Sequence, residues 1–369
     1  MIMRRFTGLT LAVGLAAVAL AGCSGTSATP SATAPSATST ASTSSVVGAS
    51  PSVAGASPSV AATSCDKKFT VGFMPKQTAD PFFVAANQGA QEAADKLGMT
   101  LIYKGPVNLD PAGQTQIITQ WTDQKVDAIT VSADDPNALA PSLKAAAAAG
   151  IKVSAWNADV APDAREFFMD NPRASDLAAA LVENMVSSVG PEAKILVMTS
   201  TLQAPNQNAW LSAVQTYVST KYPKLVLQAV LPGNSDTAAS FNIAKSWLQA
   251  HPETQGILTV DGSELAGAAQ AVNSLNLKGK VTLVGVGVPS QNGPDLLSGT
   301  VKAVVLWNPI DLGYAAIYMV HAQLCGTIKV GDAKLSAGRL GDLTFTTKDT
   351  ITLGAAFVFT KDNVSNYKF

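Results

Sequence analysis

Polar side chains and aromatic rings follow the ends of several short apolar runs in this sequence. Carboxylates accept pairs of hydroxyl hydrogen bonds, amides both donate and accept, and aromatic rings cover C–H faces. This combination favours a neutral, polyhydroxylated ligand such as a sugar or a polyol. The candidate ligand-binding residues are Lys76, Phe82, Phe83, Trp156, Asn157, Asp159, Asn206, Gln207, Asp261 and Asn308.

The same residue types also have ordinary structural uses. Lys76 could be a solvated loop lysine, and Asn206 could cap the helix that follows it. One of Phe82 and Phe83 is expected in the core, and Trp307 could pack against the protein or stack on a ligand. For three further acids we expect helix capping: Asp134, Asp135 and Asp311.

Catalysis needs a nucleophile with a base, an acid–base pair, or a metal, and no motif in the sequence points to one of these. His251 precedes Pro252 at a predicted helix end, and His321 lies within a helical pattern. The run 285–287 is no dinucleotide fingerprint, because Ser290 occupies the third glycine position. Three Cys and two His are too few for a multi-ligand zinc or iron–sulfur site. We therefore predict no catalytic residues, no metal and no cofactor.

Strand-like and helix-like runs alternate from residue 69 onwards, which predicts parallel sheets built from right-handed βαβ units. The expected strands are 69–74, 100–103, 128–132, 151–155, 195–199, 225–231, 256–260 and 281–286. The expected helices are 82–97, 110–125, 137–149, 175–189, 207–221, 237–250 and 264–275. With weaker strands near the C-terminus the number reaches about ten, too many for one comfortable sheet. We predict an α/β fold with two doubly wound parallel-sheet lobes, divided near residues 166–175.

The N-terminal segment has the pattern of an export signal. Residues 1–22 combine a basic start, an apolar stretch and small residues, and they end in Leu20-Ala21-Gly22-Cys23. This ending resembles the lipobox of bacterial lipoproteins, in which the chain is cut before the Cys and lipid is attached to its sulfur; the alternative is an ordinary secretory signal with a chance Cys. Residues 24–64 are almost entirely Ser, Thr, Ala, Pro, Gly and Val, which predicts a solvated tether. We expect an exported protein, anchored by lipid on Cys23 to the outer face of the cytoplasmic membrane.

Several runs in the expected lobes match a known family when they are taken together. They are Met74-Pro75-Lys76, Pro81-Phe82-Phe83, Gly89-Ala90, Tyr103-Lys104-Gly105-Pro106, Val131-Ser132-Ala133, Trp156-Asn157-Ala158-Asp159, Asn206-Gln207-Asn208-Ala209-Trp210, Gly299-Thr300-Val301-Lys302 and Asn366-Tyr367-Lys368-Phe369. From about residue 69 to the end, the chain resembles the sugar-type substrate-binding proteins of bacterial ABC importers, which have the type I periplasmic-binding fold. Within that group it most resembles the rhamnose-binding and autoinducer-2-binding branch.

The resemblance carries over to the candidate site only in part. Lys76 matches the ligand-contacting Lys of the autoinducer-2 binders. The first Asp of their Trp-Asp-Ser-Asp motif is Asn157 here, and the second is Asp159. Their Asp-Gln pair is Asn206-Gln207, and their Pro-Asp-Ala is Val260-Asp261-Gly262. Because two charged acceptors have become amides, the comparison favours a small sugar or polyol other than autoinducer-2.

The resemblance implies a solute-binding component that captures its ligand by hinge closure and delivers it to an ABC permease and its ATPase. The ligand would be a rhamnose-like deoxyhexose, a pentose, a tetritol or a molecule like autoinducer-2. The alternative is a surface receptor for a signalling system. We expect a monomer. We also expect no binding to nucleic acid, because the charge is balanced, with 25 Lys+Arg against 26 Asp+Glu. The expected first lobe is 66–170 with a returning helix at about 309–326, and the second is 171–306 with a C-terminal segment of about 327–369 that crosses the hinge.

Two cysteines remain besides Cys23. Cys65 lies just before the first expected strand, and Cys325 ends the helix that the resemblance returns to the first lobe. Both would then lie at the edge of that lobe far from the ligand, in a compartment where disulfides persist. We predict a Cys65–Cys325 disulfide; the alternative is two separate thiols.

Overall fold

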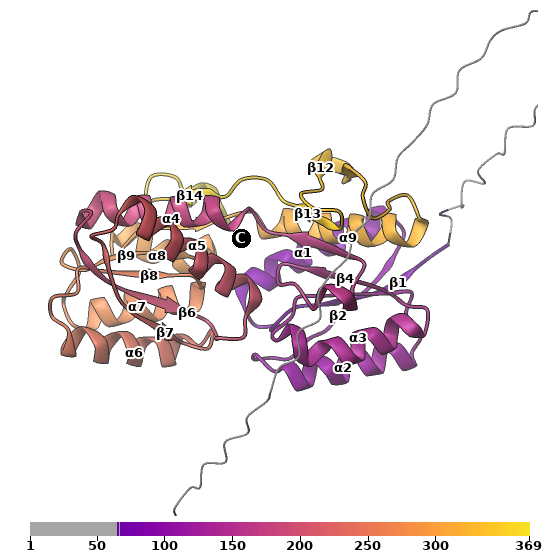
Figure 1. Ribbon diagram of the computed structural model, residues 1–369, viewed down its shortest axis with the longest axis horizontal. Coiled ribbons are helices and arrows are strands. Elements are labelled where there is room, and N and C mark those ends of the chain that lie inside the picture. The colour runs from indigo at the N-terminus through magenta and orange to yellow at the C-terminus, as the bar shows by residue number, and fades with distance from the viewer. Residues whose placement is uncertain (1–64, 66) are drawn as a thin grey trace, which may run out of the picture. The chain divides into compact units, whose positions relative to one another are not determined.

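A computed structural model describes residue 65 and residues 67–369, so the predicted signal, the lipid site at Cys23 and the tether lie outside the described residues (Figure 1). Within the unit 61–369, two six-stranded sheets each form the centre of one lobe. None of the helices in residues 67–369 combines the length and the apolar character that a membrane-spanning helix needs.

The first sheet has the strand order β13-β5-β4-β3-β1-β2, and all its paired strands are parallel. Its strands are β1 (Thr70–Met74), β2 (Thr100–Tyr103), β3 (Ala128–Val131), β4 (Lys152–Trp156), β5 (Phe167–Asp170) and β13 (Thr350–Thr352). The helices of this lobe are α1 (Pro81–Lys96), α2 (Pro111–Asp123), α3 (Pro136–Ala148) and α9 (Pro309–Cys325). Helix α1 packs against α9, and α2 packs against α3. The long helix α9 thus returns to the first lobe from far along the chain (Figure 1).

The second sheet repeats this arrangement, with the order β14-β10-β9-β8-β6-β7. Its strands are β6 (Lys194–Thr199), β7 (Val226–Pro232), β8 (Gly256–Thr259), β9 (Thr282–Val286), β10 (Val301–Leu306) and β14 (Phe357–Phe359). Its helices are α4 (Ala174–Val189), α5 (Pro205–Lys221), α6 (Thr237–Ala250), α7 (Gly262–Ser274) and α8 (Pro289–Ser298). Strand β14 pairs antiparallel with β10, whereas the other pairs are parallel. The prediction of two parallel-sheet lobes is confirmed.

Helix α9 docks on α1 through glycine. A Cβ atom at Gly89 would overlap the backbone carbonyl of Ile310, and one at Gly313 would overlap the carbonyl of Ala86. Only glycine permits so close an approach of two helix backbones. Residues separated by more than 200 positions are therefore held backbone to backbone in the first lobe.

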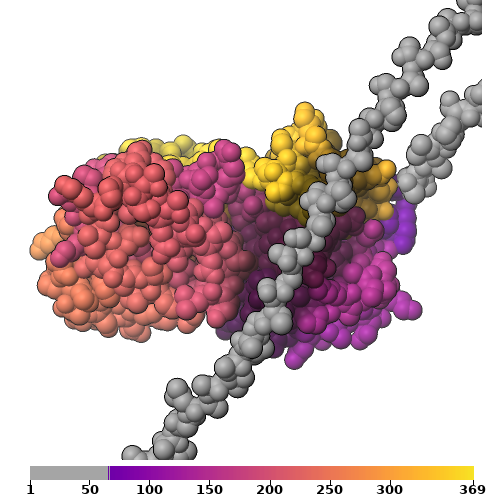
Figure 2. Space-filling model, in the orientation of Figure 1, coloured from indigo at the N-terminus to yellow at the C-terminus, as the bar shows by residue number. Residues whose placement is uncertain are grey.

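The chain passes between the lobes at three places within residues 67–369. The first connection joins β5 to α4, the second joins β10 to α9, and the third joins β13 to β14. Between α9 and β13 a small antiparallel pair forms from β11 (Lys334–Ser336) and β12 (Asp342–Thr344). The C-terminal residues, yellow in Figures 1 and 2, consequently extend over both lobes.

Hydrogen-bonding caps explain several helix starts. Asp80 caps α1 by accepting from the Phe82 N–H at 2.8 Å, and Asp135 caps α3 as expected. The expectation for Asp311 was wrong, because Asn308 is the capping residue of α9 and Asp311 lies in its first turn. Asp134 accepts from the backbone of Asp110 instead of capping α3.

Strand β5 and helix α8 are among the elements that the sequence did not predict. Strand β5 occupies the stretch that we had read as the boundary between the lobes, and α8 follows β9 directly. Both are short, and β5 has a run of only four residues, Phe167–Asp170, with no alternation of polar and apolar positions.

Cys65 and Cys325 form a disulfide, with their Cα atoms 5.6 Å apart. Cys65 precedes β1 and Cys325 ends α9, so the bond joins the start of the described chain to the returning helix. The ring of His321, one turn earlier on α9, lies beside the bond, with its Nε2 atom 3.5 Å from the Cys325 sulfur. The sulfur pair lies where the first lobe faces away from the carboxyl ends of its strands.

Candidate ligand-binding site

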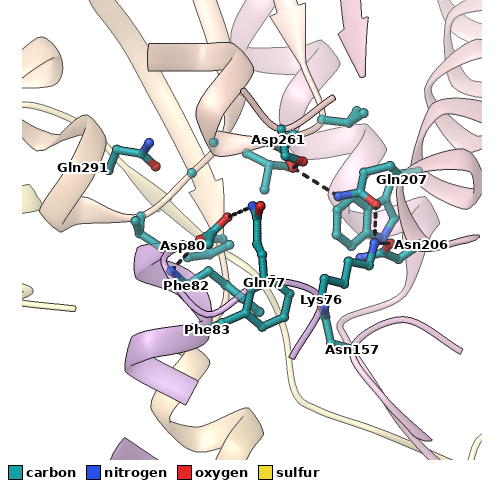
Figure 3. Close-up of a pocket in the computed structure, with 18 of the residues that line it drawn as sticks. Lys76, Gln77, Asp80, Phe82, Phe83, Asn157, Asn206, Gln207, Asp261 and Gln291 are labelled. Carbon is teal, nitrogen blue, oxygen red and sulfur yellow. Dashed lines mark hydrogen bonds between the residues drawn. The ribbon is translucent and has the colours of Figure 1, made fainter. Parts of the chain in front are cut away.

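A pocket lies at corresponding points of the two sheets. In the first sheet β1 stands between β2 and β3, and in the second β6 stands between β7 and β8. In open α/β sheets the connections leave toward opposite faces at such a point, and ligands bind in the crevice beyond the strand ends. The loops that follow β1, β6 and β8 meet there around a small cavity of about 50 Å³ (Figure 3).

Both lobes supply the lining. The lining residues are Lys76, Gln77, Asp80, Phe82, Phe83, Leu109, Asn157, Asn206, Gln207, Trp210, Ser235, Val260, Asp261, Gly262, Val286, Gly287, Val288, Gln291, Leu306 and Trp307. Seven of the ten residues expected from the sequence are among them: Lys76, Phe82, Phe83, Asn157, Asn206, Gln207 and Asp261.

Lys76 connects the two lobes. It follows β1, and its ammonium donates to the Asn206 Oδ1 atom at 2.8 Å and to the Gln207 Oε1 atom at 3.0 Å, both in the first turns of α5 (Figure 3). Ala204 is the capping residue of α5, so Asn206 does not cap this helix and its side chain contacts the lysine. Lys76 is only 3% exposed, and its loss of hydration lowers the pKa of its ammonium to about 8, although nearby carboxylates oppose the change.

Asp261 is the anchoring acid of the second lobe. It follows β8, and its Oδ1 atom caps α7 by accepting from the Ser263 N–H at 2.9 Å. Its Oδ2 atom accepts from the Gln207 Nε2 atom at 3.2 Å and from the Ser235 hydroxyl at 3.1 Å. A continuous hydrogen-bonded series therefore runs from Lys76 through Gln207 to Asp261.

Asp80 faces this series from the first lobe, although we had not placed it among the site residues. Its Oδ2 atom accepts from the Gln77 amide at 3.2 Å, and its side chain lines the pocket (Figure 3). Burial, followed by the charge of Asp261, raises the pKa of Asp80 to about 6. Its position directly before Pro81-Phe82-Phe83 hid this role, because the Asp-Pro pair is also a common helix start.

Aromatic rings form one wall of the pocket. Phe82 packs edge-on against both Phe83 and Trp307, and Trp307 in turn contacts Trp210, with ring centres 5.2–5.8 Å apart. Trp307 is 1% exposed, and its indole Nε1 atom has no hydrogen-bond partner among the described residues. This wall can cover the apolar face of a sugar ring while the indole N–H serves as a donor.

Asn157 shapes the end of β4. It has a φ of 60°, a left-handed conformation that Asn tolerates better than most residues. Its side-chain amide donates to the Ser132 hydroxyl at 3.0 Å, and its backbone N–H donates to the carbonyl of Met169. The turn directs the chain away from the sheet and leaves Asn157 at the pocket wall.

Three of the expected residues lie elsewhere. The carboxylate of Asp159 accepts two hydrogen bonds of 2.8 Å from the guanidinium of Arg165. It therefore forms an ion pair within the first lobe. Trp156 is fully buried, stacks on Phe73, and donates from its indole to the Met74 carbonyl. Asn308 caps α9 by accepting from the N–H of the second residue that follows it, at 3.0 Å. We therefore remove Asp159, Trp156 and Asn308 from the proposed ligand set.

Comparison with known proteins places the chain in a family. The model of the periplasmic binding protein domain matches residues 71–328. The chain belongs to the periplasmic binding protein family. The ribose import binding protein of Bacillus subtilis (strain 168) is 26% identical over 210 residues, which span 56% of this chain and 67% of that protein.

Solved structures of this family agree with the fold. The LsrB protein from Clostridium saccharobutylicum in complex with AI-2 has 29% sequence identity and a TM-score of 0.78, covering 81% of this chain and 100% of that one. A solute-binding protein of an ABC transporter from Clostridium phytofermentas with bound L-rhamnose has 27% identity and a TM-score of 0.77, covering 81% of this chain and 98% of that one. The names of these relatives give ribose import, bound AI-2 and bound L-rhamnose, and their fold is the type I periplasmic-binding fold that the sequence predicts.

Proposed function

We propose that this chain is the lipid-anchored, extracytoplasmic solute-binding component of an ABC importer and that it captures a small neutral sugar or polyol. The observation that carries the proposal is the direct contact of Lys76, on the first lobe, with Asn206 and Gln207 on the second. A ligand in the adjoining cavity would contact both lobes at once.

Capture works through contacts that exist only when the lobes are together. A ligand shifts the equilibrium toward the closed state only by the interactions it gains there. Two of the three ammonium donors of Lys76 are used by the amides of the second lobe, which leaves one for a ligand hydroxyl. Asp80 and Asp261 offer carboxylate oxygens from opposite lobes. Closure assembles donors, acceptors and the aromatic wall around the ligand.

The ligands named for the relatives support this chemical class. AI-2 and L-rhamnose are small polyhydroxylated molecules, and the name of the Bacillus subtilis protein gives ribose. The amides at Asn157 and Asn206 reduce the negative charge of the site relative to the autoinducer-2 binders that the sequence resembles. We therefore favour a neutral deoxyhexose, pentose or tetritol over autoinducer-2.

A thermal-shift screen tests the proposal. The mature protein would be heated with L-rhamnose, D-ribose, D-arabinose, D-allose, erythritol and autoinducer-2 in turn, because a molecule that binds only the folded state raises the melting temperature by mass action. We expect at least one to raise it and to lose that effect in Gln207→Ala. Lys224→Ala, which changes an exposed ion pair of the same lobe, is the matched control. If no sugar or polyol shifts the melting temperature, the proposed ligand class is wrong.

Transport and anchoring need their own measurements. Deletion of the gene should abolish uptake of the radiolabelled sugar identified by the screen, and Cys23→Ala should release the protein from the membrane fraction. Normal uptake without the protein would favour the alternative of a receptor for signalling.

A further inference from the structure

Glu264 is a fully buried acid that lies behind the pocket. It is 0% exposed and belongs to the first turn of α7, which packs against α6 and β9. Its Oε1 atom accepts from the backbone N–H of Ser235 at 2.9 Å. Its Oε2 atom has no hydrogen-bond partner among the described residues. Buried acids are nearly always paired or serve a purpose, so this arrangement calls for a function.

The carboxyl group reaches the ligand site through one intermediate residue. Ser235, whose N–H binds Glu264, donates its hydroxyl to Asp261, and Asp261 also accepts from Gln207. The loop 233–236 is tightly packed here, because a Cβ atom at Gly233 would overlap the Ser240 hydroxyl and crowd the Glu264 carboxyl. The position of Asp261 in the pocket thus depends on a loop that Glu264 holds.

The surroundings of Glu264 favour its neutral form. Burial, followed by the charge of Asp261, raises the pKa of Glu264 well above its ordinary value. A neutral carboxyl group can donate its O–H, which a carboxylate cannot. The neutral form can therefore bind both Ser235 and Asp261, whereas ionisation would place two negative charges side by side.

Three other charged groups lie on or next to the helices packed against α7. Asp236 directly precedes α6 and accepts from the Ala239 N–H at 2.9 Å, and on α6 the ammonium of Lys245 lies 5.3 Å from the centre of the Phe241 ring. Asp295 on α8 is half-buried and lies near the end of that helix. Burial and the charge of Asp261 are the main causes of the raised pKa of Glu264, and backbone hydrogen bonds oppose it.

We propose that Glu264, in its neutral form, is a positioning residue that fixes the loop 233–236 and Asp261 in the geometry required for ligand binding, and that its ionisation weakens binding. The inference rests on the proposed function in that Asp261 is taken to contact the sugar. Glu264 itself does not touch the ligand.

The first experiment needs no ligand. Urea unfolding of wild type and Glu264→Gln would be followed from pH 5 to pH 9. An acid whose pKa is raised by folding holds a proton that the unfolded chain releases, so its contribution to stability falls as pH rises above its ordinary value toward the raised one. We expect wild type to lose stability relative to Glu264→Gln over this range. Glu192→Gln, which changes an exposed acid of the same lobe, is the control and should not reproduce the divergence of Glu264→Gln. Parallel profiles of wild type and Glu264→Gln would overturn the assignment of a neutral Glu264.

The second experiment measures the affinity for the panel sugar that gives the largest thermal shift. Glu264→Gln keeps an acceptor for Ser235 and a donor for Asp261, so we expect its affinity at pH 6 to stay within about threefold of wild type. Between pH 6 and pH 9 its affinity should fall less than the affinity of wild type does. Lys76, Asp80 and Asp134 also titrate in this range, but they do so in both proteins. Glu264→Ala should weaken binding about tenfold or more, the cost expected of an unmade hydrogen bond in a buried site. Rescue by Gln but not by Ala identifies positioning; equal affinity in all three proteins overturns it.

A third measurement separates this inference from the proposed function. The crystal structure of Glu264→Ala should show Ser235 and Asp261 displaced from their wild-type positions, whatever the protein binds. If no panel sugar binds, the proposed function fails, and this structure together with the pH profiles still decides the role of Glu264. An unmoved loop would refute that role.

Discussion

Replacing Lys76 with methionine separates ligand capture from stability. Met has a similar length but no charge and no donor, so the two amide oxygens that Lys76 binds on α5 lose their partner. A free amide oxygen costs about 1–3 kcal/mol when it is left unpaired in a buried site. A ligand hydroxyl also loses its donor, and we expect the affinity for the sugar found in the screen to fall about tenfold to a hundredfold.

The same substitution also removes a buried charge, and this contribution stabilises the folded state. Burial lowers the pKa of Lys76 from 10.5 to about 8, and at about 1.4 kcal/mol for each unit of pKa, keeping the ammonium charged in the folded state costs about 3–4 kcal/mol. Methionine removes this cost, which offsets the loss of the two hydrogen bonds. We therefore expect Lys76→Met to change the free energy of unfolding by less than about 2 kcal/mol at pH 7.

The pH dependence checks the reasoning. Below pH 8 the lysine is charged in both folded and unfolded states, and its cost is fully present. As the pH rises from about 8 toward 10.5, the folded state gives up the proton first, so wild type gains stability relative to Lys76→Met. Urea unfolding at pH 7 and pH 10, with calorimetric titration of the sugar, measures both effects. This account of Lys76 would be refuted if Lys76→Met bound the sugar with wild-type affinity. It would also be refuted if the variant lost several kcal/mol in free energy of unfolding at pH 7.

Three further predictions follow from other parts of the molecule. Asp159→Ala should leave the affinity of the sugar unchanged and lower the free energy of unfolding by about 1–3 kcal/mol, because the buried guanidinium of Arg165 loses a paired carboxylate; weakened binding in calorimetry would return Asp159 to the site. The unmodified protein should bind autoinducer-2 poorly, and Asn157→Asp combined with Asn206→Asp should improve binding, whereas tight binding by wild type would contradict the role assigned to these amides. Cys325→Ser should lower the free energy of unfolding by at most about 5–6 kcal/mol, the chain-entropy value for a sequence separation of 260 residues; titration of two free thiols in the unreduced, unfolded mature protein would reject the disulfide.

The sequence predicts the lobes because strands and helices alternate with clear signals at their ends. Helix α6 was expected at the residues where it lies, Thr237–Ala250, since Asp236 precedes it and apolar positions recur with helical spacing. Strand β5 was not predicted because its four residues show no alternation of polar and apolar positions and so resemble a linker. It is defined only by its pairing with β4 and β13. Pairing between distant segments leaves no local trace in a single sequence.

Site residues were predicted correctly where their position directly after a strand determines that they line the pocket. They were predicted wrongly where the direction of the side chain determines its contacts. Residues directly after β1, β6 and β8 must lie at the crevice, and Lys76, Gln207 and Asp261 do. Asp159 also follows a strand, but it turns toward Arg165, a partner that the sequence pattern does not indicate. Asp80 reaches the pocket while it caps α1, and either role alone would have explained its position in the sequence.

The return of α9 to the first lobe affects the order in which the protein can fold during synthesis. The first lobe begins at β1, yet it needs α9 against α1, β13 at the edge of its sheet and the disulfide partner of Cys65. These parts emerge from the ribosome only after the second lobe has been made as far as β10. The N-terminal half therefore lacks its complete core until synthesis is nearly finished, and such contacts between distant residues form slowly. If the chain is exported as proposed, late completion of the first lobe would favour an unfolded polypeptide during its passage across the membrane.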